Sequence, residues 1–98
     1  MTITKERNDN VLKIVLEGRL DTMTAPQLEA EIRDGLQDVE QLIFDFSQLE
    51  YISSAGLRVL LMAEKSMAQK GGMKVTGVNE LISEIFEVTG FTDILDIE

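Results

Sequence analysis

The chain has 98 residues, 44% of them apolar and 28% charged, which predicts a single domain over residues 1–98 with one core and a solvated surface. It contains no Cys and no His, which excludes disulfides, thiol catalysis and a Ser-His-Asp triad within the chain. The sequence also has no calcium-loop or phosphate-loop motif, so we expect no metal and no cofactor. The net charge of −9 argues against binding to nucleic acid or to an anionic membrane. The chain has neither an apolar run long enough to span a membrane nor the apolar core of a signal peptide, so we expect a cytoplasmic protein.

Residues 2–7 and 11–17 predict two strands, joined by the turn signal Asn8-Asp9-Asn10. Residues 11–16 are almost continuously apolar, which is typical of a central strand covered on at least one face. The segment Gly18-Arg19-Leu20-Asp21 is expected to lead out of this strand.

A first helix is predicted to begin at Thr24, which forms a capping-box pattern with Gln27 and is followed by Pro26 in the first turn. Apolar residues then recur at every fourth position and predict the buried stripe: Leu28, Ile32 and Leu36. Gly35 is unfavourable inside a helix, so it marks either close packing or an early end.

The next strand is expected over residues 41–46, followed by a polar turn and a central helix from about Ser54 to Gln69. This helix is apolar over a wide arc, with one predicted face formed by Leu57, Leu60, Leu61 and Met67 and the neighbouring face by Val59, Met62 and Ala63. Such an arc requires either a second element of the chain or a partner to cover it.

Gly71-Gly72 is expected to end the central helix, and residues 73–76 to form a short strand. Asn79 can cap a third helix, which Gly90 ends and whose predicted core stripe is Leu81, Ile82, Ile85 and Phe86. Residues 91–97 form either a last strand or a helical turn. The order β-β-α-β-α-β-α predicts an α/β fold with a mixed sheet of four to five strands and three to four helices.

Charge is unevenly distributed along the sequence. From Val75 to the end there are six acids and no base, whereas Arg58, Lys65, Lys70 and Lys74 give the central helix region a positive excess. The acidic segment is either a solvated face or the binding surface for a basic protein partner.

Three interpretations of Ser53-Ser54 remain open from the residues themselves. In the first, one serine is expected to cap the central helix whatever else is true, because serine is a preferred N-cap residue. A catalytic nucleophile would need a base, and none is evident. The third is phosphorylation, since a helix N-terminus carries about half a positive charge and accepts anions.

Asp21 and Asp45 both follow apolar segments and are predicted to lie at the carboxyl ends of strands. Each carboxylate can accept hydrogen bonds from loop amides. Alternatively, the two flank the serine site and contact a kinase or its nucleotide-bound metal.

The segment Asp45 to Leu57, DFSQLEYISSAGL, resembles the signature of STAS domains, in particular the bacterial anti-sigma factor antagonists. Gly18-Arg19-Leu20-Asp21 and Ala25-Pro26 support the resemblance, which extends over essentially the whole chain. It implies a STAS-like mixed sheet and a protein-binding regulator that is not itself an enzyme.

In that family, the unphosphorylated antagonist binds an anti-sigma factor that is itself a serine kinase, and so releases a sigma factor for transcription. Phosphorylation by the kinase switches binding off, and a phosphatase reverses it. The resemblance assigns the acceptor to Ser54. Ser53, which stands where many members have Asp, is an alternative site. The partner-binding residues expected on this basis are Asp21, Asp45, Ser53, Ala55, Gly56, Arg58, Val59 and Met62.

A second expectation comes from STAS domains that are not phosphorylated. These serve as scaffolds or accessory subunits, for example of lipid-transport ATPases or of stress-signalling complexes. In such a protein the serine would only cap the helix, while Val59 and Met62 would dock a permanent partner.

Overall fold

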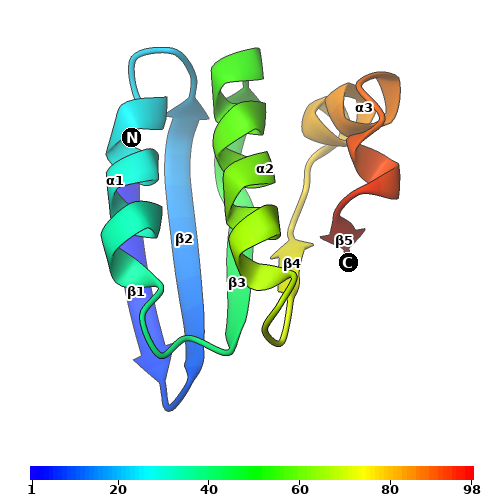
Figure 1. The fold of residues 1–98 in the computed structure, drawn as a ribbon. Helices are drawn as coiled ribbons and strands as arrows, with labels where there is room; N and C mark the ends of the chain where they lie inside the picture. The colour runs from blue at the N-terminus through cyan, green and yellow to red at the C-terminus, as the bar shows by residue number, and fades with distance from the viewer.

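A five-stranded sheet in the order β1-β2-β3-β4-β5 runs through the molecule in the computed structural model, which describes all 98 residues (Figure 1). β1 pairs with β2 in antiparallel fashion, and every other pairing is parallel. The elements are β1 Thr2–Asn8, β2 Val11–Leu20, α1 Ala25–Gly35, β3 Gln41–Ile52, α2 Ser54–Met67, β4 Met73–Thr76, α3 Glu80–Val88, the 3₁₀ turn η1 Phe91–Asp93 and β5 Asp96–Ile97. The predicted mixed α/β architecture is therefore confirmed.

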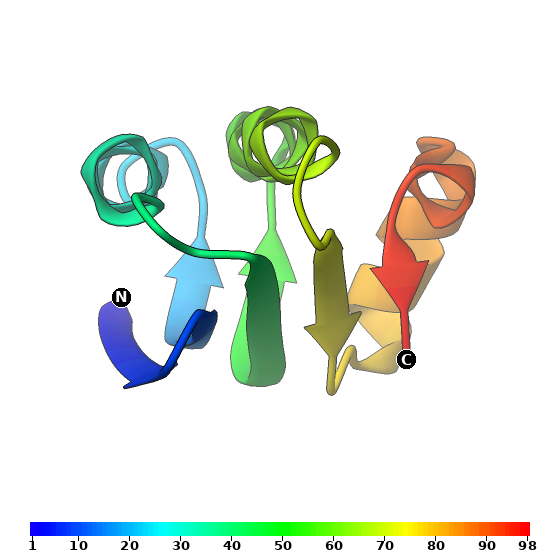
Figure 2. The ribbon, with the colours of Figure 1, turned by 60° about the horizontal axis from the view of Figure 1, so that its bottom comes forward.

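The helices α1 and α2 lie side by side on one face of the sheet, and Figure 2 shows that the opposite face carries no helix. Alternate residues of the central strands point toward the helices and are buried, as expected for a sheet with one covered face. The fully buried ones include Ile14 and Leu16 in β2 and Phe44 in β3. No helix here has the length and apolar character needed to cross a membrane.

The predicted turn at Asn8-Asp9-Asn10 is present, with Asp9 in the left-handed region at φ 57°. β2 does not end at residue 17, as the sequence predicted, but continues to Leu20. Its pairing with β3 shifts register on either side of residues 17 and 18, and Gly18 takes φ 108°, a conformation that favours glycine.

Helix α1 starts next to Thr24, but the predicted capping box is not formed. The Thr24 hydroxyl instead donates to the carbonyl of Arg19 at 2.8 Å and accepts from the amide of Asp21 at 2.9 Å. Leu28, Ile32 and Leu36 are buried as predicted. The helix ends at Gly35, which decides the alternative in favour of an early end.

β3 is twice the predicted length, because residues 47–52 are strand and not a polar turn. These added residues of β3 pair with the last four residues of β2 through Glu17–Gln48, Arg19–Tyr51 and Leu20–Ile52. Ser, Gln and Glu have low strand propensity, so only the pairing with β2 identifies the segment as a strand.

Both apolar faces predicted for α2 are covered largely by the chain itself. Val59 is 3% exposed and Leu57 is 6% exposed, while Leu60, Ala63 and Met67 are fully buried; Leu61 is only partly buried. The expectation that Val59 docks a partner is wrong, because its side chain is buried in the core between α2 and the sheet. Met62 is only partly buried.

Asn79 caps α3 as predicted, since its side-chain oxygen accepts from the amide of Ile82 at 2.8 Å. Gly90 ends this helical segment in the left-handed conformation at φ 82°. Of the predicted core stripe, Ile82 and Phe86 are buried, but Leu81 is 49% exposed and does not belong to the core. The end of the chain forms both a helical turn, η1, and a short strand, β5.

A row of four aromatic rings ties the C-terminal part to the sheet. Successive centroids from Phe44 to Phe46, Phe86 and Phe91 are 5.7, 6.5 and 6.4 Å apart. Within β3, only residues 42–45 pair with β4. Beyond them α3, and no further strand, packs beside the carboxyl-terminal part of β3.

Candidate functional site

The loops that follow β2 and β3 meet at the carboxyl edge of the sheet. The amide of Ser53 donates to the carbonyl of Leu20 at 2.9 Å, which joins the start of α2 to the end of β2. This places the β2–α1 loop, with Asp21, next to the Ser53-Ser54 pair. Carboxyl edges of parallel strands are the usual location of binding sites in α/β sheets.

Ser53 occupies the N-cap position of α2, with an extended backbone at φ −101° and ψ 177°. Its hydroxyl, however, caps no amide of the helix, and its Oγ atom is buried without a hydrogen-bond partner. The prediction that one of the two serines caps the helix through its side chain is therefore wrong. The buried hydroxyl also lies out of reach of solvent.

Ser54 is the first residue of α2 and is exposed. The first backbone amides of a helix find no hydrogen-bond acceptor within the helix. In α2 the side chain of the N-cap residue, Ser53, does not accept from them either. The exposed Ser54 hydroxyl thus stands beside free amides at the positive end of the helix dipole. An anion at this position would be stabilised.

Gly56 has a packing role in the first turn of α2. A Cβ atom at this position would lie 2.7 Å from Leu20 Cγ, 2.8 Å from Ile52 Cγ1 and 3.0 Å from the Leu20 carbonyl oxygen. Only glycine lets the helix approach the ends of β2 and β3 so closely. Gly56 is buried, so it contributes to the site by setting the position of Ser54 and not by side-chain contact with a partner.

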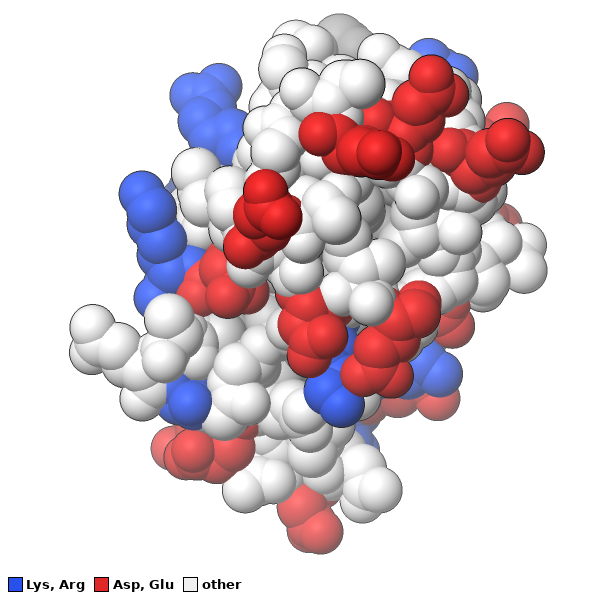
Figure 3. Space-filling view, turned by 90° about the vertical axis from the view of Figure 1, so that its right-hand side faces the viewer, with Lys and Arg blue, Asp and Glu red and all other residues white.

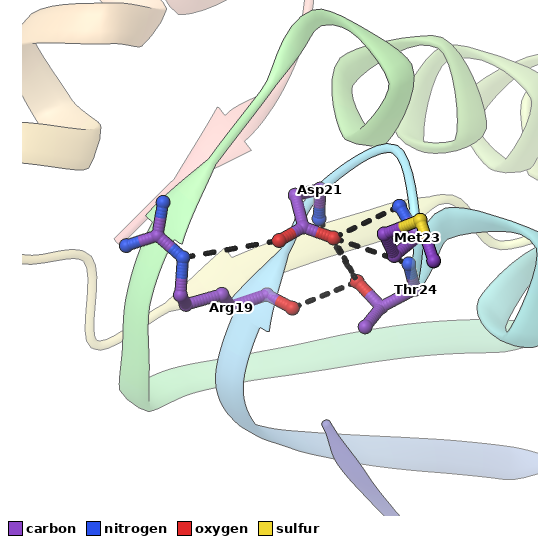
Figure 4. Close-up of polar contacts among 4 residues, drawn as sticks. All are labelled: Arg19, Asp21, Met23 and Thr24. Carbon is purple, nitrogen blue, oxygen red and sulfur yellow. Dashed lines mark hydrogen bonds and ion pairs between the residues drawn. The ribbon is translucent and has the colours of Figure 1, made fainter.

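The Asp21 carboxylate organises the β2–α1 loop (Figure 4). Its Oδ1 accepts from the Met23 amide at 3.0 Å and the Thr24 amide at 3.2 Å, while its Oδ2 lies 3.8 Å from Arg19 Nε. Partial desolvation opposes ionisation, but the hydrogen bonds from Thr24 and Met23 and the charge of Arg19 outweigh it. The pKa of Asp21 is therefore held below its usual value.

Three further residues beside the serines were not predicted as functional. Met23 is 86% exposed at the tip of the loop that Asp21 holds. The Arg19 guanidinium lies 4.4 Å from the centre of the Tyr51 ring, in a cation–π contact. A methionine in a short polar loop could have been noticed in the sequence, whereas the Arg19–Tyr51 contact depends on the register between β2 and β3.

Asp45 does not lie at the carboxyl edge, contrary to the prediction, because β3 continues for seven residues beyond it. It sits in the middle of the strand, paired with Val15 and Thr76. Hydrogen bonds from Ser47 lower the pKa of Asp45, partial desolvation opposes them, and Lys13 at 3.8 Å adds to the lowering. Asp45 thus supports the strand and does not flank the serines.

The remaining predicted residues are arranged along one side of α2. Ser54, Arg58 and Met62 are spaced by four residues and therefore share a helix face. Arg58 is exposed, whereas Ala55 and Met62 are partly buried, and Met62 also lines a hollow between α1 and α2. We call the residues Ser54, Ala55, Arg58 and Met62 the α2 surface.

Comparison with known proteins shows the family of the chain. A family model described as "Mlab, STAS domain" matches residues 3–96, nearly the whole chain. The chain belongs to the STAS domain family. The resemblance of the segment DFSQLEYISSAGL is thereby confirmed at the level of the family.

Several relatives of this STAS domain carry related names. BtrV of Bordetella bronchiseptica, whose name proposes it as an anti-sigma factor antagonist, is 34% identical over 99% of this chain and 85% of its own length. An anti-sigma-B factor antagonist of Listeria monocytogenes is 30% identical over 96% of this chain and 84% of that protein. The crystal structure of an anti-sigma factor antagonist from Mycobacterium paratuberculosis is 26% identical, with a TM-score of 0.88 over 98% of this chain and 83% of that one.

Proposed function

We propose that this STAS domain is an anti-sigma factor antagonist. In the unphosphorylated form it binds an anti-sigma factor through the α2 surface and thereby frees a sigma factor in the cytoplasm. Phosphorylation of Ser54 by that anti-sigma factor, acting as a serine kinase, ends the binding, and a phosphatase restores it. The names of relatives at 34% and 30% identity support the antagonist role.

The observation that carries the choice of Ser54 is the contrast between the two serines. The Ser54 side chain is exposed, whereas the Oγ atom of Ser53 is buried. A kinase must reach the hydroxyl oxygen in line with the transferred phosphoryl group, so burial of Oγ disfavours Ser53 as the acceptor. The alternative assignment to Ser53 would require the start of α2 to open first.

A phosphate on Ser54 is compatible with the fold, because it would lie at the N-terminus of α2 near uncapped amides. Arg58, one turn further along, could pair with it. A partner that covers the α2 surface would instead have to take a group of nearly two negative charges out of water. Since about 1.4 kcal/mol is tenfold in affinity, an uncompensated dianion is sufficient to end binding.

The direct test incubates the protein with its candidate partner, ATP and magnesium, and measures the mass of the intact chain. We expect a gain of one phosphate in the wild type and in Ser53→Ala, and no gain in Ser54→Ala. A phosphate that persists in Ser54→Ala and disappears in Ser53→Ala would transfer the acceptor role to Ser53.

A charge-mimicking variant tests the electrostatic part of the switch. We expect Ser54→Asp to weaken partner binding at least about tenfold, because the carboxylate must be desolvated in the interface. Its melting temperature should stay nearly unchanged, since an acid is favourable at a helix N-terminus. Calorimetric titration and thermal unfolding measure the two effects, and wild-type affinity of this variant would contradict the electrostatic account.

The second candidate function is a scaffold or accessory subunit that is never phosphorylated. The description of the matching family model, which names Mlab and not an antagonist, is the observation that favours it. This alternative predicts a stable complex that ATP does not dissociate and that Ser54→Ala leaves intact.

A further inference from the structure

Helix α3 has an apolar side that the rest of the chain leaves uncovered. Leu81 is 49% exposed and Val88 is 78% exposed, and Ile85 between them is partly buried. Because residues four and seven positions apart lie on the same helix face, these three form one continuous stripe. Ile82 and Phe86 on the adjoining side are fully buried, so the stripe extends the core outward into solvent.

Acidic side chains border this stripe along one side. Glu84 is next to Leu81 and Val88 in helical projection, and Glu80 and Glu87 follow it around the helix. All three are exposed, and none takes part in an ion pair of the structure. Residues 75–98 contain no Lys or Arg that could neutralise them. Figure 3, which views the molecule from the α3 side, shows acidic groups in the upper part of this side, where α3 lies, and basic groups mainly along its left edge and in its lower part.

We propose that this α3 face, formed by Leu81, Ile85 and Val88 with Glu80, Glu84 and Glu87, docks a basic amphipathic helix of another protein. The spacing of the stripe matches the anchors with which helices pack side by side. The acidic border calls for Lys or Arg on the matching edge of the partner helix.

Charge complementarity also decides against other occupants. A two-fold dimer through this face would bring the same acids of both copies together, which is repulsive. An anionic membrane surface would be repelled for the same reason. The face shares no residue with the α2 surface, so this docking goes beyond the proposed function and needs no phosphorylated serine.

The probe for the test is a synthetic amphipathic helix of Leu and Lys about 14 residues, or four turns, long. Titrated into ¹⁵N-labelled protein, it should shift the amide resonances of residues 80–90 most strongly. A matched peptide with Glu in place of Lys should bind at least about tenfold more weakly, since its charge repels the acidic border.

Variants separate the α3 face from general attraction to an acidic protein. The double variant Leu81→Ser, Val88→Ser should weaken binding at least about tenfold, whereas Met23→Ser, which removes another exposed apolar side chain, should not. Glu84→Gln should weaken binding about threefold, and Glu40→Gln, at an exposed acid outside the face, should have no effect. Because the substituted side chains are exposed, the fold should be retained, and the spectrum of each free variant checks this.

Four results would overturn the proposal. Resonance shifts centred outside residues 80–90, or equal losses in Glu84→Gln and Glu40→Gln, would mean nonspecific charge attraction. Equal affinity for the Lys and Glu peptides would refute the charge complementarity. Self-association of the free protein that Leu81→Ser, Val88→Ser abolishes would show that the occupant is a second copy of this chain.

Discussion

Ser53 and Ser54 are adjacent in the sequence but have different environments, because the chain changes direction between them. Ser53 still has the extended backbone of β3, and its side chain points into the protein. Ser54 is the first helical residue, and its side chain points to solvent. At the residue scale, the end of one strand thus determines which hydroxyl an enzyme can reach.

Gly56 gives a prediction at the same scale. Gly56→Ala should lower the free energy of unfolding by about 1–2 kcal/mol, since the clash with Leu20 and Ile52 exceeds the gain in helix propensity. The control is Gly35→Ala, where an added Cβ meets nothing within 4 Å, and a result between no change and a gain of about 1 kcal/mol is expected. Urea unfolding measures both, and equal behaviour of the two variants would refute the packing role of Gly56.

At the scale of elements, α3 depends on Asn79 in two ways. Its Oδ1 atom caps the helix by accepting from the Ile82 amide, and its Nδ2 donates to the Leu49 carbonyl at 3.0 Å, which ties the helix to β3. The same side chain therefore sets where α3 begins and where it lies.

Asn79→Ala should lower the free energy of unfolding by about 2 kcal/mol, because both hydrogen bonds are lost. Asn79→Asp keeps the cap and loses only the donor, so its loss should be about half as large. The two variants are compared by urea unfolding. A larger loss in Asn79→Asp than in Asn79→Ala would show that the cap contributes little.

The packing of α2 near β5 leaves Glu64 in an unfavourable environment. Its Oε2 atom is buried without a hydrogen-bond partner, and desolvation together with the nearby charge of Asp96 raises the pKa of Glu64 above its usual value. The Glu64 carboxyl group therefore stays protonated to higher pH in the folded protein than in the unfolded chain. Stability from this group falls as the pH rises above about 4.5.

Glu64→Gln removes this titration. We expect the variant to be more stable than the wild type at pH 7, with the difference disappearing below about pH 4.5, where Glu64 is protonated in both states. Thermal unfolding as a function of pH measures this, with Glu40→Gln as the control for the change in net charge. A wild type that is the more stable protein at pH 7 would contradict the assignment.

At the scale of the whole molecule, the charge of −9 acts against the compact state through self-repulsion. Five exposed or partly exposed ion pairs act in the opposite direction, but such pairs contribute little each. We therefore expect the melting temperature to rise with added NaCl, as salt screens the repulsion. The variant Glu84→Gln, Glu87→Gln, Asp93→Asn should show a smaller rise. A fall with salt would mean that the ion pairs dominate.

The sequence by itself determined the order of the elements, the antiparallel start of the sheet and the family, because these follow from local periodicity, turn residues and a contiguous motif. The hydrophobic pattern is strong enough to identify two strands without any partner: residues 11–16 are almost continuously apolar, and so are residues 42–46. Asn79 and Gly90 mark the ends of α3 through local chemistry alone.

Only the tertiary structure decided which side chains of the site are accessible. Residues 47–52 become strand through pairing with β2, and this moves Asp45 away from the edge. The cap predicted for Thr24 is replaced by contacts within the β2–α1 loop, while Val59 is buried and Leu81 exposed. These outcomes depend on neighbours distant in sequence, and local propensity carries no information about which face a neighbour will cover.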